Sequence, residues 1–329
     1  MSFTSSHAES ALERSLNFEG RPAPGSFRLL ETDKVISRSP PDQTGVASTA
    51  TLPDLTRGCP LGFVGLGNQG QMLVRHWLDR GHQLVLFDIR PETMEQFERE
   101  GVVAAANPAE VAARVALTAI CVVDDHQMEQ VVLAPDGILA GAAAGSIIVI
   151  HSTISVGCLC KLGEAARRQD VTILDAPVSG GAGKAGTRTS YMIGGPWEVV
   201  RHCLHMFGER GENVTYTGPS GSGLKAKLAH QIVLCVNLLA ASEGYRLAAA
   251  AGLEHSIMRD VLRFGVANSR AVEQFQSILA SPEAMQLFSK DLELAIDWAK
   301  SLGMALPGAK LVLELLPSIF NEAEAHLTI

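Results

Sequence analysis

The sequence has no excess of basic residues. It contains 27 Lys and Arg against 35 Asp and Glu, which gives a net charge of −8 at neutral pH and a pI near 5.7. An acidic chain of this kind argues against nucleic acid or an anionic membrane as the main partner. Small acidic substrates stay compatible with it, because a local pocket can be positive on an acidic protein.

Cysteine is scarce and long apolar runs are missing. Only the Cys158-Leu-Cys160 pair is closely spaced among the six cysteines, and no metal-ligand pattern extends from it. We therefore expect a reducing compartment and no structural metal. No stretch approaches the length of a transmembrane run. These absences favour a cytoplasmic location.

Residues 1 to about 58 lack any sustained hydrophobic period. They are rich in Ser, Thr, Pro and Arg, and no apolar core of a secretory signal is present. Glu9, Glu13 and Glu19 weaken an organelle transit interpretation. The pattern predicts a mostly disordered tail. An interaction tail and a start codon placed too far upstream both remain open.

The whole chain has 329 residues, a length that indicates roughly two domains. Between residues 59 and 221 apolar strand patterns alternate with helical ones, which predicts an α/β fold, a Rossmann-type doubly wound parallel sheet. Residues 222–329 are almost purely helical and predict an all-α C-terminal domain, which a long helix over 224–251 joins to the first. The expected strands are 61–65, 83–88, 116–123, 146–151, 171–175, 190–194 and 213–217, and the expected later helices are 254–264, 269–279, 289–302 and 308–324.

A glycine motif follows the first expected strand. Gly65, Gly67 and Gly70 form Gly-x-Gly-x-x-Gly between that strand and a helical pattern. One glycine of such a motif makes a tight turn, one lets backbone approach a pyrophosphate, and one lets helix pack on strand. An ordinary strand-to-helix turn is the alternative explanation. The next strand ends in Asp88, which supports the dinucleotide interpretation.

The acid at position 88 bears on the choice of cofactor. A carboxylate there accepts hydrogen bonds from both hydroxyls of an adenosine ribose and repels a 2′-phosphate. Asp88 therefore favours NAD over NADP. Arg90, two residues on, could reach a phosphate, so NADP stays possible.

Five separated motifs occur in one order along the chain, and together they resemble the β-hydroxyacid dehydrogenase family, which includes 3-hydroxyisobutyrate dehydrogenase and tartronate semialdehyde reductase. The similarity covers residues 61 to about 316. Its carriers are Gly62-Phe-Val-Gly-Leu-Gly-Asn-Gln-Gly70, His151-Ser-Thr-Ile-Ser155, Asp175-Ala-Pro-Val-Ser-Gly-Gly181, Gly218-x-x-Gly-x-Gly-x-x-x-Lys227 and Lys290-Asp-Leu-Glu-Leu-Ala295. The resemblance implies a dehydrogenase or reductase that uses NAD or NADP.

Lys227 is the expected catalytic residue. Carbonyl reduction needs a proton for the developing alkoxide, and a nearby Lys can stabilise and protonate that oxygen. The resemblance assigns this role to Lys227, whereas a solvated surface Lys is the alternative. Four residues on, Gln231 stands where the family carries Asn to hold the Lys and the substrate. His230 precedes it and could be a proton partner, although a structural His is the more ordinary interpretation.

The loop after residue 174 is the expected substrate cradle. Ser179 offers a hydroxyl, and Gly180 and Gly181 offer backbone N–H groups to a carboxylate. The resemblance assigns this loop to the substrate and places Thr153 beside substrate or nicotinamide; an ordinary turn, and a helix cap formed by Ser152 and Thr153, are the alternatives. Lys290 is expected to reach the cofactor from a helix that begins after Ser289. The remaining expected cofactor contacts are Leu66, Asn68, Gln69, Val122 and Val123.

Several positions depart from the family pattern. Val123-Asp-Asp125 stands where Pro usually follows the fourth strand, and Ile150 replaces an Asp. Arg188 stands near the usual Gly-Thr-Leu of the substrate loop. The chain ends at Ile329 without the family's usual final Gly-x-Gly-x-x-Asp helix.

The leading hypothesis is an NAD(P)-dependent enzyme that interconverts a small β-hydroxyacid and its semialdehyde or keto form, with Lys227 handling the proton. An imine reductase of the same architecture is one alternative. A nucleotide-binding or scaffold protein with a degenerate cleft is another. The family association through its helical domain implies a homodimer or homotetramer.

Overall fold

The computed structural model describes residues 52–55, 58–97, 102–180, 189–207, 213–281 and 283–326. All of them lie in one compact unit. The expected tail up to residue 51, Gly181, Arg188 and Ile329 lie outside the described residues.

The described chain begins with strands alternating with helices and ends in helices. The strands are β1 (Leu61–Val64), β2 (Leu84–Phe87), β3 (Val103–Ala104), β4 (Leu117–Ile120), β5 (Ile147–Ile150), β6 (Thr172–Asp175), β7 (Val178–Ser179), β8 (Ser190–Gly194) and β9 (Asn213–Gly218). The helices are α2 (Asn68–Asp79), α3 (Pro91–Glu95), α4 (Pro108–Arg114), α5 (Asp125–Leu133), α6 (Ile138–Gly141), α7 (Val156–Arg167), α8 (Trp197–Phe207), α9 (Ser222–Ala250), α10 (His255–Phe264), α11 (Arg270–Glu273), α12 (Phe275–Leu279), α13 (Ala284–Ser301) and α14 (Pro307–His326).

Capping residues set the start of several helices in the sheet domain. Asn107 Oδ1 accepts from Glu110 N, and Pro108 occupies the first turn of α4. Asp124 and Ser155 cap α5 and α7 in the same way, through Gln127 N and Cys158 N. Short polar side chains at these positions satisfy N–H groups that the helix itself leaves without partners.

The strands form one sheet in the order β3-β2-β1-β4-β5-β6-β8-β7, and β9 pairs with β8. Pairing is parallel from β3 to β6, as the sequence predicts for a doubly wound sheet. β8 runs antiparallel to β6 and β7, a reversal that the strand–helix alternation does not indicate. The order of strands reverses direction between β1 and β4, and ligands of such sheets bind at the carboxyl ends of strands at that point.

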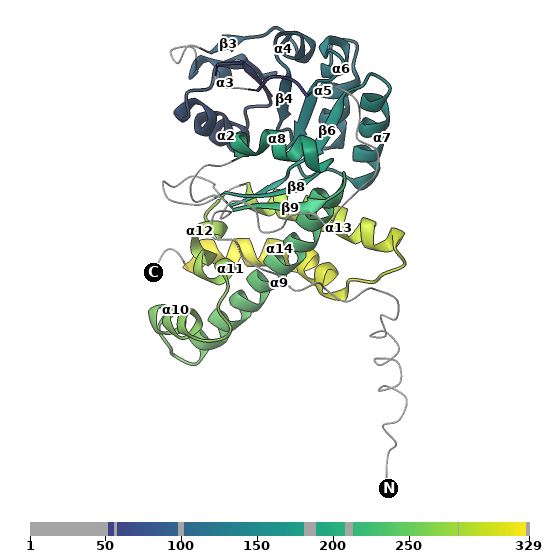
Figure 1. Cartoon of the computed structure of the whole chain (residues 1–329). Helices are drawn as coiled ribbons and strands as arrows, with labels where there is room; N and C mark the ends of the chain where they lie inside the picture. The colour runs from purple at the N-terminus through teal and green to yellow at the C-terminus, as the bar shows by residue number, and fades with distance from the viewer. Residues whose placement is uncertain are drawn as a thin grey trace, which may run out of the picture. The chain divides into compact units, whose positions relative to one another are not determined.

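Side chains of the parallel strands alternate between two cores. Phe63, Leu86 and Val149 pack with α2 and α8 on one face, whereas Val64 and Ile148 pack with α4 to α7 on the other. Because both faces are covered, the strands consist of nearly continuous apolar runs. Figure 1 shows the helices on the two sides of the sheet.

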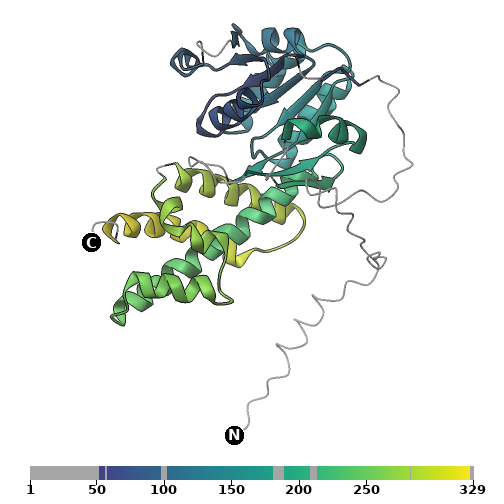
Figure 2. The ribbon, with the colours of Figure 1, turned by 60° about the vertical axis from the view of Figure 1, so that its left-hand side comes forward.

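The helices after β9 enclose a third core. It is built from the apolar faces of α9, α13 and α14 with the short α11 and α12, and Leu238, Leu292 and Leu316 are among its fully buried residues. Figure 2 shows α9 running from the sheet into this helical group. The expected helix over 269–279 is two short helices, with Gln274 between them.

The Asp175 side chain links the end of β6 to the start of α9 through hydrogen bonds. Its two carboxylate oxygens accept from Gly221 N at 2.7 Å and Leu224 N at 2.8 Å. A carboxylate at a helix N-terminus interacts favourably with the free N–H groups and the helix dipole. Burial raises the pKa of Asp175 above its ordinary value, and the backbone N–H groups of Gly221 and Leu224 act in the opposite direction.

Two expectations need correction. An 18-residue window of α9 reaches a mean hydropathy of 1.3, so α9 does have the length and apolar composition of a membrane-spanning helix. Core helices of globular proteins meet the same test, and α9 packs against α13, α14 and β8.

The tail was expected to extend to residue 58, yet Leu55 is buried in the sheet core. The His202 and His205 side chains also form hydrogen bonds with the Pro53 and Leu55 carbonyl oxygens.

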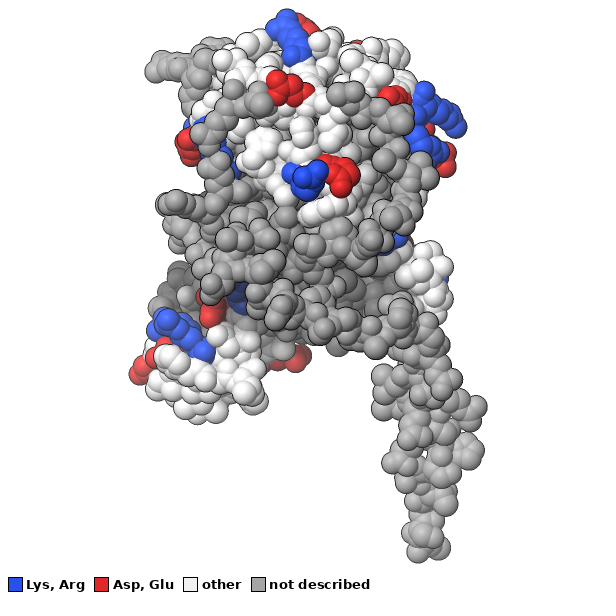
Figure 3. All heavy atoms as spheres, in the orientation of Figure 1, with Lys and Arg blue, Asp and Glu red and all other residues white. Residues whose placement is uncertain are grey.

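Charged side chains of the described residues form small groups of mixed sign on the face in Figure 3. Ion pairs such as Lys161 with Glu129 and Arg201 with Glu198 link neighbouring positions. Their side chains are about one third or more exposed, so such pairs contribute on the order of 0–1 kcal/mol each to stability.

Candidate active site

The glycine-rich loop connects β1 to α2 at the carboxyl edge of the sheet. Gly65 has φ +95°, and a Cβ there would lie 2.4 Å from the Cys121 carbonyl oxygen. A Cβ at Gly70 would lie 2.0 Å from the Gly65 carbonyl oxygen. A Cβ at Gly67 would meet no atom of the described residues within 4 Å apart from its chain neighbours, and Gly67 precedes α2 without a side-chain cap. The outer glycines are thus required for packing, while Gly67 leaves space where a phosphate can approach free N–H groups.

Asp88 lies directly after β2, beside this loop. Its Oδ2 accepts from Leu66 N at 2.5 Å, and its Oδ1 accepts from Arg90 N at 2.9 Å. Arg90 Nε is 3.3 Å from the same Oδ1, so the guanidinium is held by the acid. The carboxylate is oriented from two sides and retains lone pairs for further donors.

The other expected cofactor residues border the same edge. The Asn68 side chain donates to Glu283 Oε2, which brings the carboxylate of the residue preceding α13 to the loop. Gln69 Nε2 is buried and has no hydrogen-bond partner among the described residues. Val123 is 63% exposed, and Val122 N donates to Ser152 Oγ at 2.8 Å. Together with Gly67 and Asp88, this edge fits a dinucleotide.

Ser152 and Thr153 do not cap the helix that follows them. Ser155 takes that role for α7, and Ser152 instead ties the ends of β4 and β5 together. The Thr153 carbonyl oxygen accepts from Lys290 Nζ at 2.5 Å. The Ser-Thr motif is therefore linked to α13, which belongs to the helical part of the chain.

A buried chain of hydrogen bonds contains Lys227. Its Nζ donates to Gln231 Oε1 at 3.0 Å, and Gln231 Nε2 donates to Asp291 Oδ2 at 2.8 Å. Lys227 is 7% exposed, Gln231 1% and Asp291 0%. The first contact joins residues four apart on one face of α9. Lys290 Nζ forms an ion pair with Asp291 Oδ1 at 3.2 Å and also donates to the Thr153 carbonyl, so this ion pair links the chain to Thr153.

His230 connects this chain to the loop after β6. Its Nδ1 is 3.1 Å from Gln231 Oε1, and its Nε2 is 3.4 Å from Ser179 Oγ. Gly180 follows Ser179 with φ +80°, a conformation that glycine adopts without strain. The structure thus brings together Thr153, Ser179, Lys227, Gln231 and Lys290, which the sequence singles out from four distant segments.

Burial dominates the electrostatics of this cluster. It lowers the pKa of Lys227 from its ordinary value, an effect that Lys290 strengthens and Asp291 opposes. Burial also lowers the pKa of His230, with Lys227 acting in the same direction. Both shifts favour neutral forms, and a buried amine of lowered pKa exchanges a proton at lower pH than an exposed lysine does.

The sequence-based account of Lys290 and Asp291 is wrong in one respect. They do not open a helix, because α13 already begins at Ala284 and places Asp291 well inside it. Asp291, which a helix beginning after Ser289 would place in its first turn, is fully buried and accepts a hydrogen bond from Gln231. The signal that could have revealed it is the helical period, which continues upstream through Phe288 and Ala284, both buried. Lys225, two residues before Lys227, is exposed.

Comparison with known proteins agrees with this geometry. Residues 60–218 match the model of the NAD binding domain of 6-phosphogluconate dehydrogenase, and residues 221–328 match that of the NAD-binding domain of NADP-dependent 3-hydroxyisobutyrate dehydrogenase. An uncharacterised oxidoreductase of Mycobacterium tuberculosis is 33% identical over 270 residues, 78% of this chain and 91% of its own.

Two further relatives have more specific names. The NAD-dependent L-serine dehydrogenase of Pseudomonas aeruginosa is 30% identical over 284 residues, covering 81% of this chain and 94% of the relative. The crystal structure of 3-hydroxyisobutyrate dehydrogenase from Salmonella typhimurium is 32% identical, with a TM-score of 0.69, 79% of this chain and 93% of that chain covered. The chain is an NAD(P)-binding oxidoreductase that belongs to the β-hydroxyacid dehydrogenase family.

Proposed function

We propose that the protein interconverts a small β-hydroxyacid and its semialdehyde or keto form, with Lys227 as the proton donor and acceptor. The observation that carries the proposal is the buried chain from Lys227 through Gln231 to Asp291. Burial of a lysine amine away from water costs free energy, so a lysine with a purely structural role is rarely buried in this way. Such burial suits a residue that must exchange one proton with a bound alcohol.

The bound nicotinamide would accept the hydride from the carbon that carries the hydroxyl group, or return it to the carbonyl. During oxidation the hydroxyl proton passes to neutral Lys227, and during reduction the Lys227 ammonium returns it. Gln231 Oε1 holds the Lys227 amine in place, and Asp291 holds the amide by accepting from its Nε2. The Asp291 carboxylate also favours the ammonium form once the proton has arrived.

The carboxylate of the substrate is assigned to the loop after β6. Ser179 donates its hydroxyl proton, and Gly180 and Gly181 donate backbone N–H groups. Support comes from the two contacts of His230, which link Ser179 to Gln231 and so relate the two ends of a small acid. Two relatives are named as dehydrogenases of L-serine and of 3-hydroxyisobutyrate, both small hydroxyacids, which also supports a small carboxylate substrate.

NAD is the proposed preferred cofactor. The Asp88 carboxylate faces the glycine-rich loop and would accept the ribose hydroxyls. Its ion pair with Arg90 keeps the guanidinium from serving a 2′-phosphate. Thr153 and Lys290 would border the nicotinamide end.

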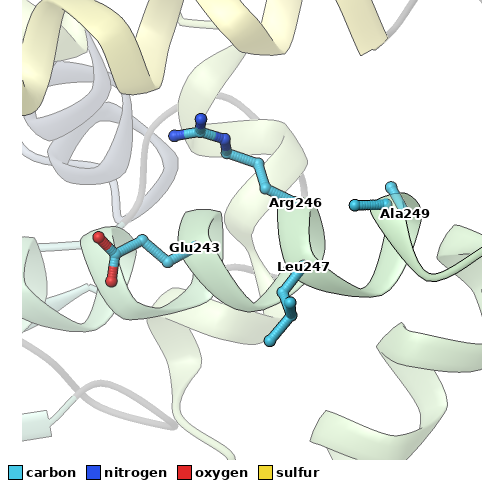
Figure 4. Close-up of a pocket in the computed structure, with 5 residues that line it drawn as sticks. Glu243, Arg246, Leu247 and Ala249 are labelled. Atoms are coloured by element: carbon cyan, nitrogen blue, oxygen red, sulfur yellow. The ribbon is translucent and has the colours of Figure 1, made fainter.

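We assign a homodimer or homotetramer and a cytoplasmic location. The far half of α9 and the adjoining α10 expose Leu247, Val261 and Phe264 at 74%, 59% and 81%. A hollow of about 600 Å³ on α9 is lined by Glu243, Arg246, Leu247, Ala249 and Ala250; Figure 4 draws these five side chains and labels the first four. Glu243 lies sixteen residues beyond Lys227, roughly 24 Å along the helix, so this hollow is separate from the proposed active site.

Initial rates at 340 nm with NAD and NADP test the proposal. The panel comprises 3-hydroxyisobutyrate, glycerate, 3-hydroxypropionate, serine and their semialdehydes, with glyoxylate and a cyclic imine. Turnover of at least one hydroxyacid is expected. Reduction of the imine alone, or no turnover by protein that still binds NAD, would contradict it.

A further inference from the structure

His230 lies between the residues that the proposed function assigns to the two ends of the substrate. Its ring contacts Gln231 Oε1 through Nδ1 at 3.1 Å and Ser179 Oγ through Nε2 at 3.4 Å. The ring is only partly buried. The ring therefore joins the proposed carboxylate cradle to the amide that holds the proton-exchanging amine.

The orientation of the Gln231 amide is fixed by its other partners. Asp291 Oδ2 is an acceptor and requires the amide NH₂ group at 2.8 Å. The amide oxygen consequently faces Lys227 and His230. No other assignment of the two amide atoms satisfies the Asp291 carboxylate.

This orientation determines the tautomer of His230. An amide oxygen only accepts, so Nδ1 must carry the proton that donates to it. In the neutral ring Nε2 then bears a lone pair. Burial and the neighbouring Lys227 lower the pKa of His230, while Asp291 and the hydrogen bond to Gln231 oppose this. The edge that faces Ser179 is thus an acceptor.

Substrate binding creates a competition for one proton. The Ser179 hydroxyl has a single hydrogen, which serves His230 Nε2 until a carboxylate takes it. Once it has turned to the carboxylate, Nε2 needs another donor. A donor on the carbon next to that carboxylate would be the nearest substrate group able to supply it, because Nε2 lies 3.4 Å from Ser179 Oγ.

We propose that His230 is a specificity-determining residue which accepts a hydrogen bond from an amino or hydroxyl group on the α-carbon of the substrate. The preferred substrate is then a β-hydroxyacid with a hydrogen-bond donor on the α-carbon, such as serine or glycerate. A β-hydroxyacid that carries only hydrogen or a methyl group there, such as 3-hydroxypropionate or 3-hydroxyisobutyrate, is disfavoured. The inference rests on the proposed function. A partly buried acceptor without a partner disfavours the analogues on the order of ten- to a hundredfold.

The test compares kcat/KM for serine and glycerate with kcat/KM for 3-hydroxypropionate and 3-hydroxyisobutyrate. The full-length chain is assayed with NAD, as the wild type and as His230→Leu, His230→Asn and His230→Gln. Leu has no acceptor, and Asn reaches only the position of Nδ1. Gln places an amide oxygen at the reach of Nε2. Lys225→Ala, an exposed neighbour on α9, is the matched control.

The ratio of kcat/KM for serine or glycerate to kcat/KM for 3-hydroxypropionate or 3-hydroxyisobutyrate should fall at least about tenfold in His230→Leu and His230→Asn. The fall should arise mainly from a higher KM for serine and glycerate. His230→Gln should stay within about threefold of the wild type. Serine should also raise the melting temperature of the NADH complex more than 3-hydroxypropionate does, and His230→Leu should remove that difference.

Two results would overturn the inference in distinguishable ways. Turnover of hydroxyacids with an unchanged ratio in His230→Leu would leave the proposed function standing and reject the role of His230. If no hydroxyacid is turned over by the wild type, the proposed function fails and the inference with it.

Discussion

Lys227 Nζ donates a hydrogen bond to Gln231 Oε1 at 3.0 Å, one turn further along α9. The contact is out of water, and its amide is held from the other side by Asp291. Since Lys227 and Gln231 lie on α9 and Asp291 on α13, the geometry of the amine depends on the packing of two helices in the C-terminal core.

Removing the charge of Asp291 should shift the pH dependence of oxidation. In the proposed mechanism neutral Lys227 is the base, so kcat/KM for oxidation should rise with pH through a pKa that burial holds below the ordinary 10.5 of Lys. Asp291 raises that pKa, and its loss lowers it further. The rising limb in Asp291→Asn should therefore lie at lower pH than in the wild type, and a limb at higher pH would contradict this electrostatic role.

Shortening the amide at position 231 should loosen the amine. Gln231→Asn restores the family residue but loses one methylene, so the new amide cannot span both Lys227 and Asp291 at their present distances. Loss of one buried charge-assisted hydrogen bond corresponds to about 1.5–3 kcal/mol, or roughly ten- to a hundredfold in kcat. NAD affinity, measured by titration calorimetry, should stay within about threefold. An activity equal to that of the wild type would show that the amide length is immaterial.

The ratio of NAD to NADP use should respond to the charge at position 88. Asp88→Asn keeps an oxygen for Leu66 N but removes the repulsion of a 2′-phosphate and releases Arg90. The ratio of kcat/KM for NAD over NADP should fall by about tenfold or more. Adding Arg90→Ala to that variant should reverse part of the gain for NADP. An unchanged ratio would mean that the specificity lies elsewhere.

His151 should make the protein less stable in acid. Its ring is 3% exposed among Phe63, Tyr191 and Phe207, Nδ1 is 2.8 Å from the Ala176 carbonyl oxygen, and Nε2 has no partner among the described residues. Burial lowers its pKa to about 4. The unfolded chain takes up this proton near pH 6.5, so the free energy of unfolding falls as the pH drops from about 6.5 to about 4, by up to about 3 kcal/mol.

Urea unfolding between pH 7 and pH 4 measures this effect. His151→Leu should be less stable near neutral pH, because the Ala176 carbonyl loses its donor, but it should depend less on pH. His126→Ala, at an exposed position on α5, is the control and should keep the slope of the wild type. Equal slopes in His151→Leu and the wild type would refute the assignment.

The sequence predicts much of this fold because local and tertiary signals agree in the sheet domain. Apolar strands, capping residues such as Asn107 and the glycines around residue 65 all indicate the parallel core. The antiparallel placement of β8 follows from long-range pairing, which no local pattern encodes.

Candidate members of the site could be named from the sequence, but the contacts between them could not. Lys227, Gln231 and Ser179 stand in recognisable motifs, so they could be named as candidates. That Asp291 is buried inside α13 depends on where that helix begins, and that His230 touches Ser179 depends on how α9 packs against the loop after β6. Contacts between segments 51 or 60 residues apart are set by the tertiary fold rather than by local preference.

The most direct test of the central claim is the effect of Lys227→Ala on turnover at 340 nm, with NAD binding measured on the same preparation. The account predicts a loss of kcat of at least about a hundredfold, the contribution typical of a positioned proton donor, with NAD affinity changed by less than about threefold. Lys225→Ala, two residues away and exposed, should retain the activity of the wild type. A Lys227→Ala enzyme that still turns over its substrate, or one that has lost NAD binding, would contradict the assignment of Lys227 as the proton-exchanging residue.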